Sequence, residues 1–78
     1  MSKYNGYPTW AQWNVSLWIL NDEGLYRVAL DCVRQCKHHG RREAARAMLD
    51  TLAEIGVTQT PDGAKYTITG ILAVMRGM

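Results

Sequence analysis

The two cysteines and a nearby histidine are the residues whose spacing most resembles a metal site. Cys32, Cys36 and His39 follow one another at intervals of four and three, so on a helix they share one face. Thiolate and imidazole are ligands that zinc prefers, but a fourth ligand is missing. The cysteines also fall on the same stripe as Leu25 and Val28, which favours a role in the core. The sequence therefore predicts no metal and no other cofactor.

Combinations of residues for catalysis are equally sparse. His38 and His39 are adjacent at an expected helix end, with no evident pocket and no carboxylate to orient them. The seven glycines are dispersed singly, so the chain has no glycine-rich phosphate loop. A chain of 78 residues also encloses little volume for a substrate. We therefore expect a protein that is not an enzyme and has no catalytic residues.

The strongest electrostatic feature is the segment of residues 34–46, which we call the basic corner. It carries five Lys and Arg against one Glu, although the formal net charge of the chain is only +2. Such a corner can contact phosphates or an acidic protein surface. A solvated face is the competing interpretation, because Arg46 can pair with Asp50 at i,i+4. Its predicted partner contacts are Arg34, Lys37, Arg41 and Arg42.

A second candidate surface is aromatic. Three Trp lie within nine residues, just after Tyr4 and Tyr7, and both residue types often anchor protein interfaces. The chain has no Phe, so the same Trp side chains must also supply bulk to the core. We expect Trp13 and Leu17 to be buried, with Trp10 or Trp18 as a partly exposed anchor for a partner.

Hydrophobic periodicity predicts that helices position these residues. The expected fold is all-α, a single domain over residues 1–78 that forms a small bundle of about four helices after an extended N-terminal arm over residues 1–9. Thr9 and Asp22 are expected N-caps, and Gly40 is expected to end the second helix. For the C-terminal part, a short hairpin around residues 57–68 is the alternative, since Thr67-Ile68-Thr69 has strand character. The expected helices cover residues 10–21, 23–39, 41–55 and 66–76.

The first helix is apolar nearly all round. Its clearest stripe comprises Trp10, Trp13, Leu17 and Leu20, and its thin polar seams are Asn14 with Asn21 and Gln12 with Ser16. Such a helix is buried on more than one side. It is therefore either the central helix of a bundle or partly covered by another chain, which would make residues 10–21 a homodimer interface.

Location is indicated by three absences in the sequence. The longest uninterrupted apolar stretch is Leu17-Trp18-Ile19-Leu20, which is too short to span a membrane. No signal peptide pattern opens the chain, and two cysteines are too few for a secreted disulfide framework. We expect a reduced, cytoplasmic protein with no membrane partner.

The first third of the chain carries a specific motif. The residues Tyr4-Asn5-Gly6, Thr9-Trp10, Trp13, Leu17-Trp18-Ile19 and Asn21-Asp22-Glu23-Gly24-Leu25-Tyr26 occur in that order. This opening resembles that of a family of small uncharacterised proteins from bacteriophages and mobile elements. The resemblance covers residues 4–26 and implies a phage-type origin without an activity or site residues.

A phage-type origin favours a small protein that binds and inhibits a host complex, such as an anti-CRISPR or anti-restriction inhibitor. On this hypothesis, charge reversal at Arg41 and Arg42 should abolish binding and leave thermal stability unchanged. One alternative is a helix-turn-helix-like regulator that reads DNA with the helix over residues 41–55. The other is a structural or accessory protein that dimerises through residues 10–21.

Overall fold

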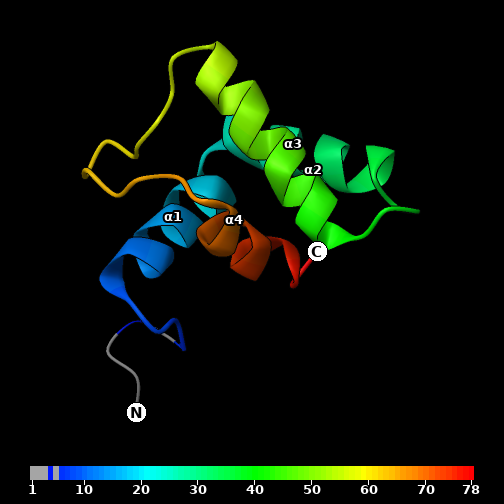
Figure 1. Cartoon of the computed structure of the whole chain (residues 1–78). Helices are drawn as coiled ribbons and strands as arrows, with labels where there is room; N and C mark the ends of the chain where they lie inside the picture. Colours follow the sequence, from blue (N-terminus) through cyan, green and yellow to red (C-terminus); the bar gives the residue numbers. More distant parts are fainter. Residues whose placement is uncertain (1–3, 5) are drawn as a thin grey trace.

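Four helices make up the regular structure of the described part of the chain, as the computed structural model shows (Figure 1). They are α1 (Trp10–Asn21), α2 (Glu23–Gln35), α3 (Arg41–Glu54) and α4 (Ile68–Met75). The structure describes residue 4 and residues 6–78, so part of the predicted N-terminal arm, residues 1–3 and 5, lies outside the described residues. The prediction of an all-α fold with four helices is confirmed.

Side chains define where three of the helices begin. Thr9 Oγ1 accepts from the Gln12 amide at 3.2 Å, and the Asp22 carboxylate accepts from the Leu25 amide at 3.0 Å. Both predicted N-caps are therefore confirmed. Thr67 Oγ1 accepts from the Gly70 amide at 3.0 Å, so α4 begins at Ile68, two residues later than expected.

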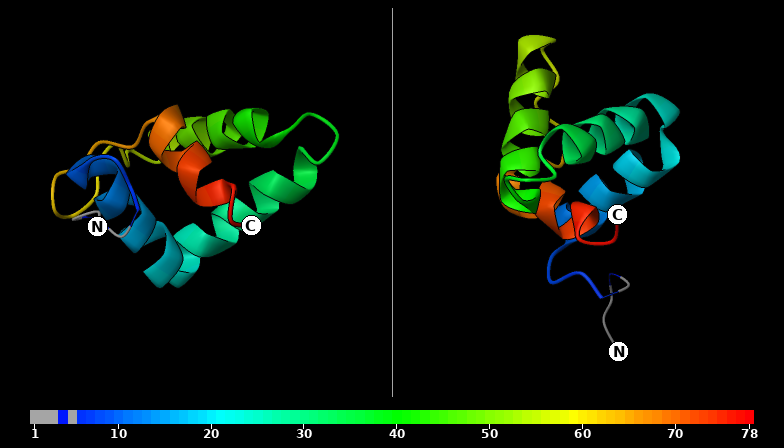
Figure 2. Two further views of the ribbon diagram at one scale, coloured as in Figure 1. Left: turned by 90° about the horizontal axis from the view of Figure 1, so that it is seen from below. Right: turned by 90° about the vertical axis from the view of Figure 1, so that its right-hand side faces the viewer.

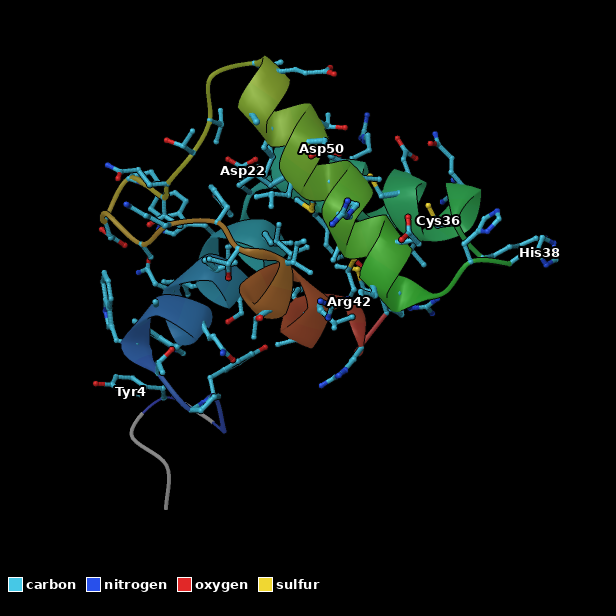
Figure 3. All side chains as sticks on the ribbon, in the orientation of Figure 1. Tyr4, Asp22, Cys36, His38, Arg42 and Asp50 are labelled. Atoms are coloured by element: carbon cyan, nitrogen blue, oxygen red, sulfur yellow. The ribbon has the colours of Figure 1, made fainter. Side chains whose placement is uncertain are left out.

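The second helix ends at Gln35 rather than near residue 39, so this predicted boundary is wrong. The amides of His39 and Gly40 both donate to the carbonyl of Cys36, at 2.8 and 3.0 Å, which closes a tight turn. Gly40 has a φ of +91°, a backbone conformation that side chains disfavour, and it is the N-cap of α3. The chain can therefore reverse over residues 36–40. His38 projects from this turn, away from the helices (Figure 3).

The segment between α3 and α4 combines features of both predicted alternatives. It forms a narrow loop, residues 57–66, that we call the hairpin loop, with one isolated antiparallel bridge between Gln59 and Lys65. The amides of Thr60 and Tyr66 donate to the carbonyls of Ala64 and Thr58, at 2.7 and 3.1 Å. No longer strand pair forms in this loop. Thr67 follows it as the N-cap of α4, the predicted helix.

The helices pack in a closed order in which each contacts its neighbours in the chain and α4 returns to α1. Figure 2 shows α4 between α1 and α3 in the view from below. Gly70 of α4 faces α1, because a Cβ there would lie at ordinary contact distance, 3.7 Å, from Val15 Cγ1. The core contains side chains from all four helices and from the hairpin loop, chiefly Val15, Ile19, Ala29, Cys32, Ala44, Ala45, Met48, Leu52, Tyr66, Ile71, Val74 and Met75.

The inner faces of α2 and α3 follow the hydrophobic spacing of the sequence, with one exception. Ala29 and Cys32 are buried on α2, and Ala45, Met48 and Leu52 are buried on α3. Ile55 follows Leu52 at a spacing of three but is 68% exposed. The reason is that α3 ends at Glu54, so the residue that follows no longer continues the face of the helix.

The buried face of α1 differs from the predicted one. Leu17 was expected inside, but it is 37% exposed, and Trp13 is only half-buried. The buried positions are Asn14 and Ser16, which belong to the polar seams of the sequence, together with Val15 and Ile19. An almost uniformly apolar helix carries no pattern from which its orientation can be read, so tertiary contacts decide which side turns inward.

Among the described residues, no helix is long and apolar enough to cross a membrane.

Candidate functional site

Three large apolar side chains on the outward side of α1 are exposed. Trp10, Leu17 and Leu20 are 41%, 37% and 50% exposed, and their spacing of seven and three places them on one side of the helix. We call these three residues the outer stripe. Exposed apolar side chains are ordinary when they are scattered singly, whereas a contiguous row is typical of a surface that another molecule covers.

A network of polar side chains fixes the orientation of α1. Asn14, which is only 2% exposed, donates from Nδ2 to Asp62 Oδ2 at 2.9 Å. Its Oδ1 accepts from the Thr60 hydroxyl at 2.5 Å, and Thr60 Oγ1 accepts from the Ala64 amide at 3.0 Å. These bonds join α1 to the hairpin loop and satisfy a buried amide that would be costly if unpaired. The buried polar side chain of α1 is therefore bonded to the loop, which leaves the outer stripe on the solvent side.

Trp18 takes part in the same network. Its Nε1 donates to Asp62 Oδ2 at 2.9 Å, and the side chain is half-buried. Of the two anchors proposed from the sequence, Trp18 thus holds the hairpin loop, whereas Trp10 is the more exposed. Trp10 therefore remains the anchor available to a partner.

The segment before α1 is held against that helix. The rings of Tyr4 and Trp13 lie 6.3 Å apart between centroids, with a tilt of 36°. The Tyr7 amide donates to the Tyr4 carbonyl at 2.9 Å, and Gly6 has a φ of +95° in this turn. Tyr4, which Figure 3 shows beside α1, therefore packs this segment against the helix.

The Asp62 carboxylate makes the network sensitive to acid. Donation from Asn14, and secondarily from Trp18, lowers the pKa of Asp62 below its ordinary value of 3.8. A lowered pKa in the folded state means that ionised Asp62 stabilises the fold above about pH 4 and that this stabilisation is lost as the pH falls further.

We expect the midpoint of urea unfolding to fall more steeply between pH 5 and pH 3 in the wild type than in Asp62→Asn, whose side chain accepts but does not titrate in this range. Unfolding curves at about pH 7, 5, 4 and 3 measure this difference. Equal acid sensitivity in the two proteins would show that the network does not depend on the charge.

The four predicted partner contacts of the basic corner do not have equivalent surroundings in the structure. Arg34, Lys37 and Arg42 are exposed, and the guanidinium of Arg34 lies 4.0 Å from the Asp31 carboxylate. Arg41 is half-buried and used internally: its Nε donates to the Met75 carbonyl at 3.3 Å and its Nη2 to the Met78 carbonyl at 3.1 Å. The expectation that reversal of Arg41 would spare stability is therefore in conflict with this bonding.

Replacing Arg41 with Gln should lower the free energy of unfolding by about 1–2 kcal/mol, because two bonds from a charged group to the end of α4 are lost. Arg42→Gln, one residue away and exposed, should change it by less than about 0.5 kcal/mol. Urea unfolding of the two variants makes the comparison. If both variants matched the wild type, the Arg41 bonds would be without consequence for the fold.

The cysteine and histidine positions do not assemble into a metal site. No group of three or more His, Cys, Asp or Glu side chains in the described part of the chain could hold a metal ion. Cys32 is buried and Cys36 half-buried, both as free thiols. Burial, and then the nearby charges at Cys36 and Asp31, raises the pKa of the Cys32 thiol. This is the environment of an inert core thiol.

One concave surface was missed by the sequence analysis. A mainly apolar groove of about 700 Å³ lies between the hairpin loop, the start of α2 and the end of α3, with Ile55 and Tyr66 among its lining residues. Burial, and then the nearby charge of Asp22, raises the pKa of Tyr66. The sequence did hold a signal for this groove, namely the apolar residues Ile55 and Val57 on either side of Gly56. A turn glycine between two apolar residues leaves one of them outside the helix.

The whole chain is similar to one known protein family. A family model described as "Family of unknown function (DUF7249)" matches residues 1–78. The match extends well beyond residues 4–26, to which the resemblance of the opening motif was limited. No curated protein and no solved structure matches the chain. The full-length match shows that the chain belongs to DUF7249, a family of unknown function.

Proposed function

We propose that the chain is a small binding protein that attaches to a partner protein through the outer stripe of α1 and acts without catalysis. The observation that carries this proposal is the arrangement of α1. Polar Asn14 and Ser16 are buried, while Trp10, Leu17 and Leu20 face outward. Leaving three large apolar side chains in water has a free-energy cost that burial against a partner would recover.

The specific form that we propose is a phage-type inhibitor of a host complex in the cytoplasm, for example one involved in restriction or CRISPR defence. Such an inhibitor needs a rigid surface and no active site. The bonds from Asn14 and Trp18 to the hairpin loop supply rigidity directly behind the outer stripe. The exposed cations Arg34, Lys37 and Arg42 form a second zone that favours an acidic or nucleic-acid-handling partner.

Affinity capture with the tagged chain from a nuclease-treated bacterial lysate tests the proposal. The double variant Leu17→Gln, Leu20→Gln removes apolar area from the outer stripe, and Gln is nearly as good a helix former as Leu. Ile55→Gln is the matched control, because Ile55 is exposed and apolar but belongs to the groove at the end of α3. We expect one protein complex to be retained by the wild type and the control, and lost by the double variant.

Three results would contradict this function. Equal retention by all three proteins would exclude the outer stripe as the contact. Loss of all retention after nuclease treatment would favour the DNA-binding alternative, whose affinity should fall steeply with salt. A mass of two chains in size-exclusion chromatography that the double variant reduces to one would favour a homodimer through residues 10–21.

A further inference from the structure

A second concave surface lies beside the first turn of α1 and is distinct from the outer stripe. It is an open groove of about 650 Å³ between the segment preceding α1 and the outer side of α4. One wall is a row on α4 at helical spacing, Thr69, Leu72, Ala73 and Arg76. Gln12 and residues 6–8 line the other wall, and Arg42 contributes from α3.

The two arginines of this groove lie at the same end of it. Arg41 Nε donates to the Met75 carbonyl, so the start of α3 is next to the end of α4. Arg42 and Arg76 are the immediate chain neighbours of that bonded pair, and Figure 3 shows Arg42 at this end of α3. In the described part of the chain neither guanidinium pairs with a carboxylate, and the groove lining includes no acidic residue.

The electrostatics at this end are unbalanced. Arg42 lies in the first turn of α3, where the helix macrodipole is positive and where cations are disfavoured. The N-cap of α3 is Gly40, which offers no side chain to accept from the free amides of the first turn. The Met75 carbonyl at the end of α4, which could attract these cations, already accepts from Arg41. Glu43 lies in the same turn, but in the described part of the chain it forms no ion pair with Arg42, so Arg42 and Arg76 both lie unpaired beside the α3 terminus.

From this juxtaposition we infer that the groove binds a small organic phosphate, with its phosphate monoester between Arg42 and Arg76 and its apolar part along Leu72 and Ala73. A phosphate monoester carries a charge of about −1.5 to −2 at pH 7, which matches two guanidinium groups better than a single carboxylate does. Thr69 lies at the other end of the α4 row, and Gln12 lines the facing wall. Both offer polar contacts to the rest of the ligand.

Isothermal titration calorimetry of the full chain with adenosine monophosphate tests the inference, with inorganic phosphate and adenosine as comparison probes. We expect adenosine monophosphate to bind more tightly than either, and Arg42→Gln and Arg76→Gln each to weaken it about tenfold or more. Arg46→Gln is the control, since it removes an exposed arginine one turn along α3 that does not line the groove. It should leave the affinity unchanged, and thermal unfolding should be similar in all three variants.

Each other result would overturn the assignment. No binding of adenosine monophosphate, or equal binding by all variants, would exclude the phosphate site. Inorganic phosphate binding as tightly as the nucleotide would show that the groove recognises no organic part, and adenosine binding as tightly would show that it recognises no phosphate. A single-stranded oligonucleotide that binds more than about tenfold tighter through the same arginines would replace the small ligand with a nucleic-acid strand.

Discussion

Replacing Ile19 with alanine should lower the free energy of unfolding by about 2–5 kcal/mol, the range for removing a large aliphatic side chain from a packed core. Ile19 has 0% of its surface exposed and belongs to the core cluster shared by all four helices. A domain of this length has a total stability of roughly 4–12 kcal/mol, so this one change removes a large part of it. The melting temperature should fall by about 4–8 °C for each kcal/mol.

The matched control is Leu17→Ala, two residues earlier on the same helix. Leu17 is exposed on the outer stripe, so its truncation should change the stability of the isolated chain by less than about 1 kcal/mol. Thermal and urea unfolding of both variants provide the comparison. A larger effect at Leu17 than at Ile19 would mean that α1 is rotated relative to this structure, with Leu17 inside as the sequence predicts.

The second large effect is expected at Asn14. Asn14→Ala removes the acceptor of the Thr60 hydroxyl and one of the two donors to Asp62, so a buried hydroxyl is left without an acceptor. The free energy of unfolding should fall by about 2–3 kcal/mol, which combines a lost hydrogen bond with the desolvation cost of the orphaned group. Circular dichroism during urea unfolding measures this loss.

Two further variants separate this network from a general effect of the substitution. Asn21→Ala alters an exposed amide on the same helix that donates to the Leu17 carbonyl, and it should change stability by less than about 0.5 kcal/mol. Thr60→Val removes the hydroxyl that Asn14 would leave unpaired. The double variant Asn14→Ala, Thr60→Val should therefore cost less than the sum of the single ones, and strict additivity would contradict the proposed coupling.

Helix positions were predictable because local signals define them. Thr9 and Asp22 carry the side chains that cap α1 and α2, and the regular spacing of Val28, Ala29 and Cys32 reveals the inner face of α2. The end of α2 was not predictable, because Gly40 suits both the residue after one helix and the N-cap of the next. In the structure, a turn over residues 36–40 separates the two helices, and Gly40 is the N-cap of α3.

The orientation of α1 shows where sequence reasoning stops. Asn14 and Ser16 are polar, and a single helix viewed alone places them toward water. Their burial depends on Thr60 and Asp62, which lie more than forty residues away in the chain. Pairings over such distances leave no periodic trace. For the same reason Arg41 looked like a free cation, although its partners are carbonyls at the end of α4.

The position of α4 between α1 and α3 has a consequence for synthesis of the protein on the ribosome. Ile71, Val74 and Met75 fill the space between the two earlier helices, and Gly70 is the point at which α4 meets Val15. While residues 68–75 are still inside the exit tunnel, the emerged helices have no complete core and expose their inner faces. The nascent chain should therefore complete its core only after residues 68–75 have left the exit tunnel, and until then it should be a client of chaperones that hold apolar surface.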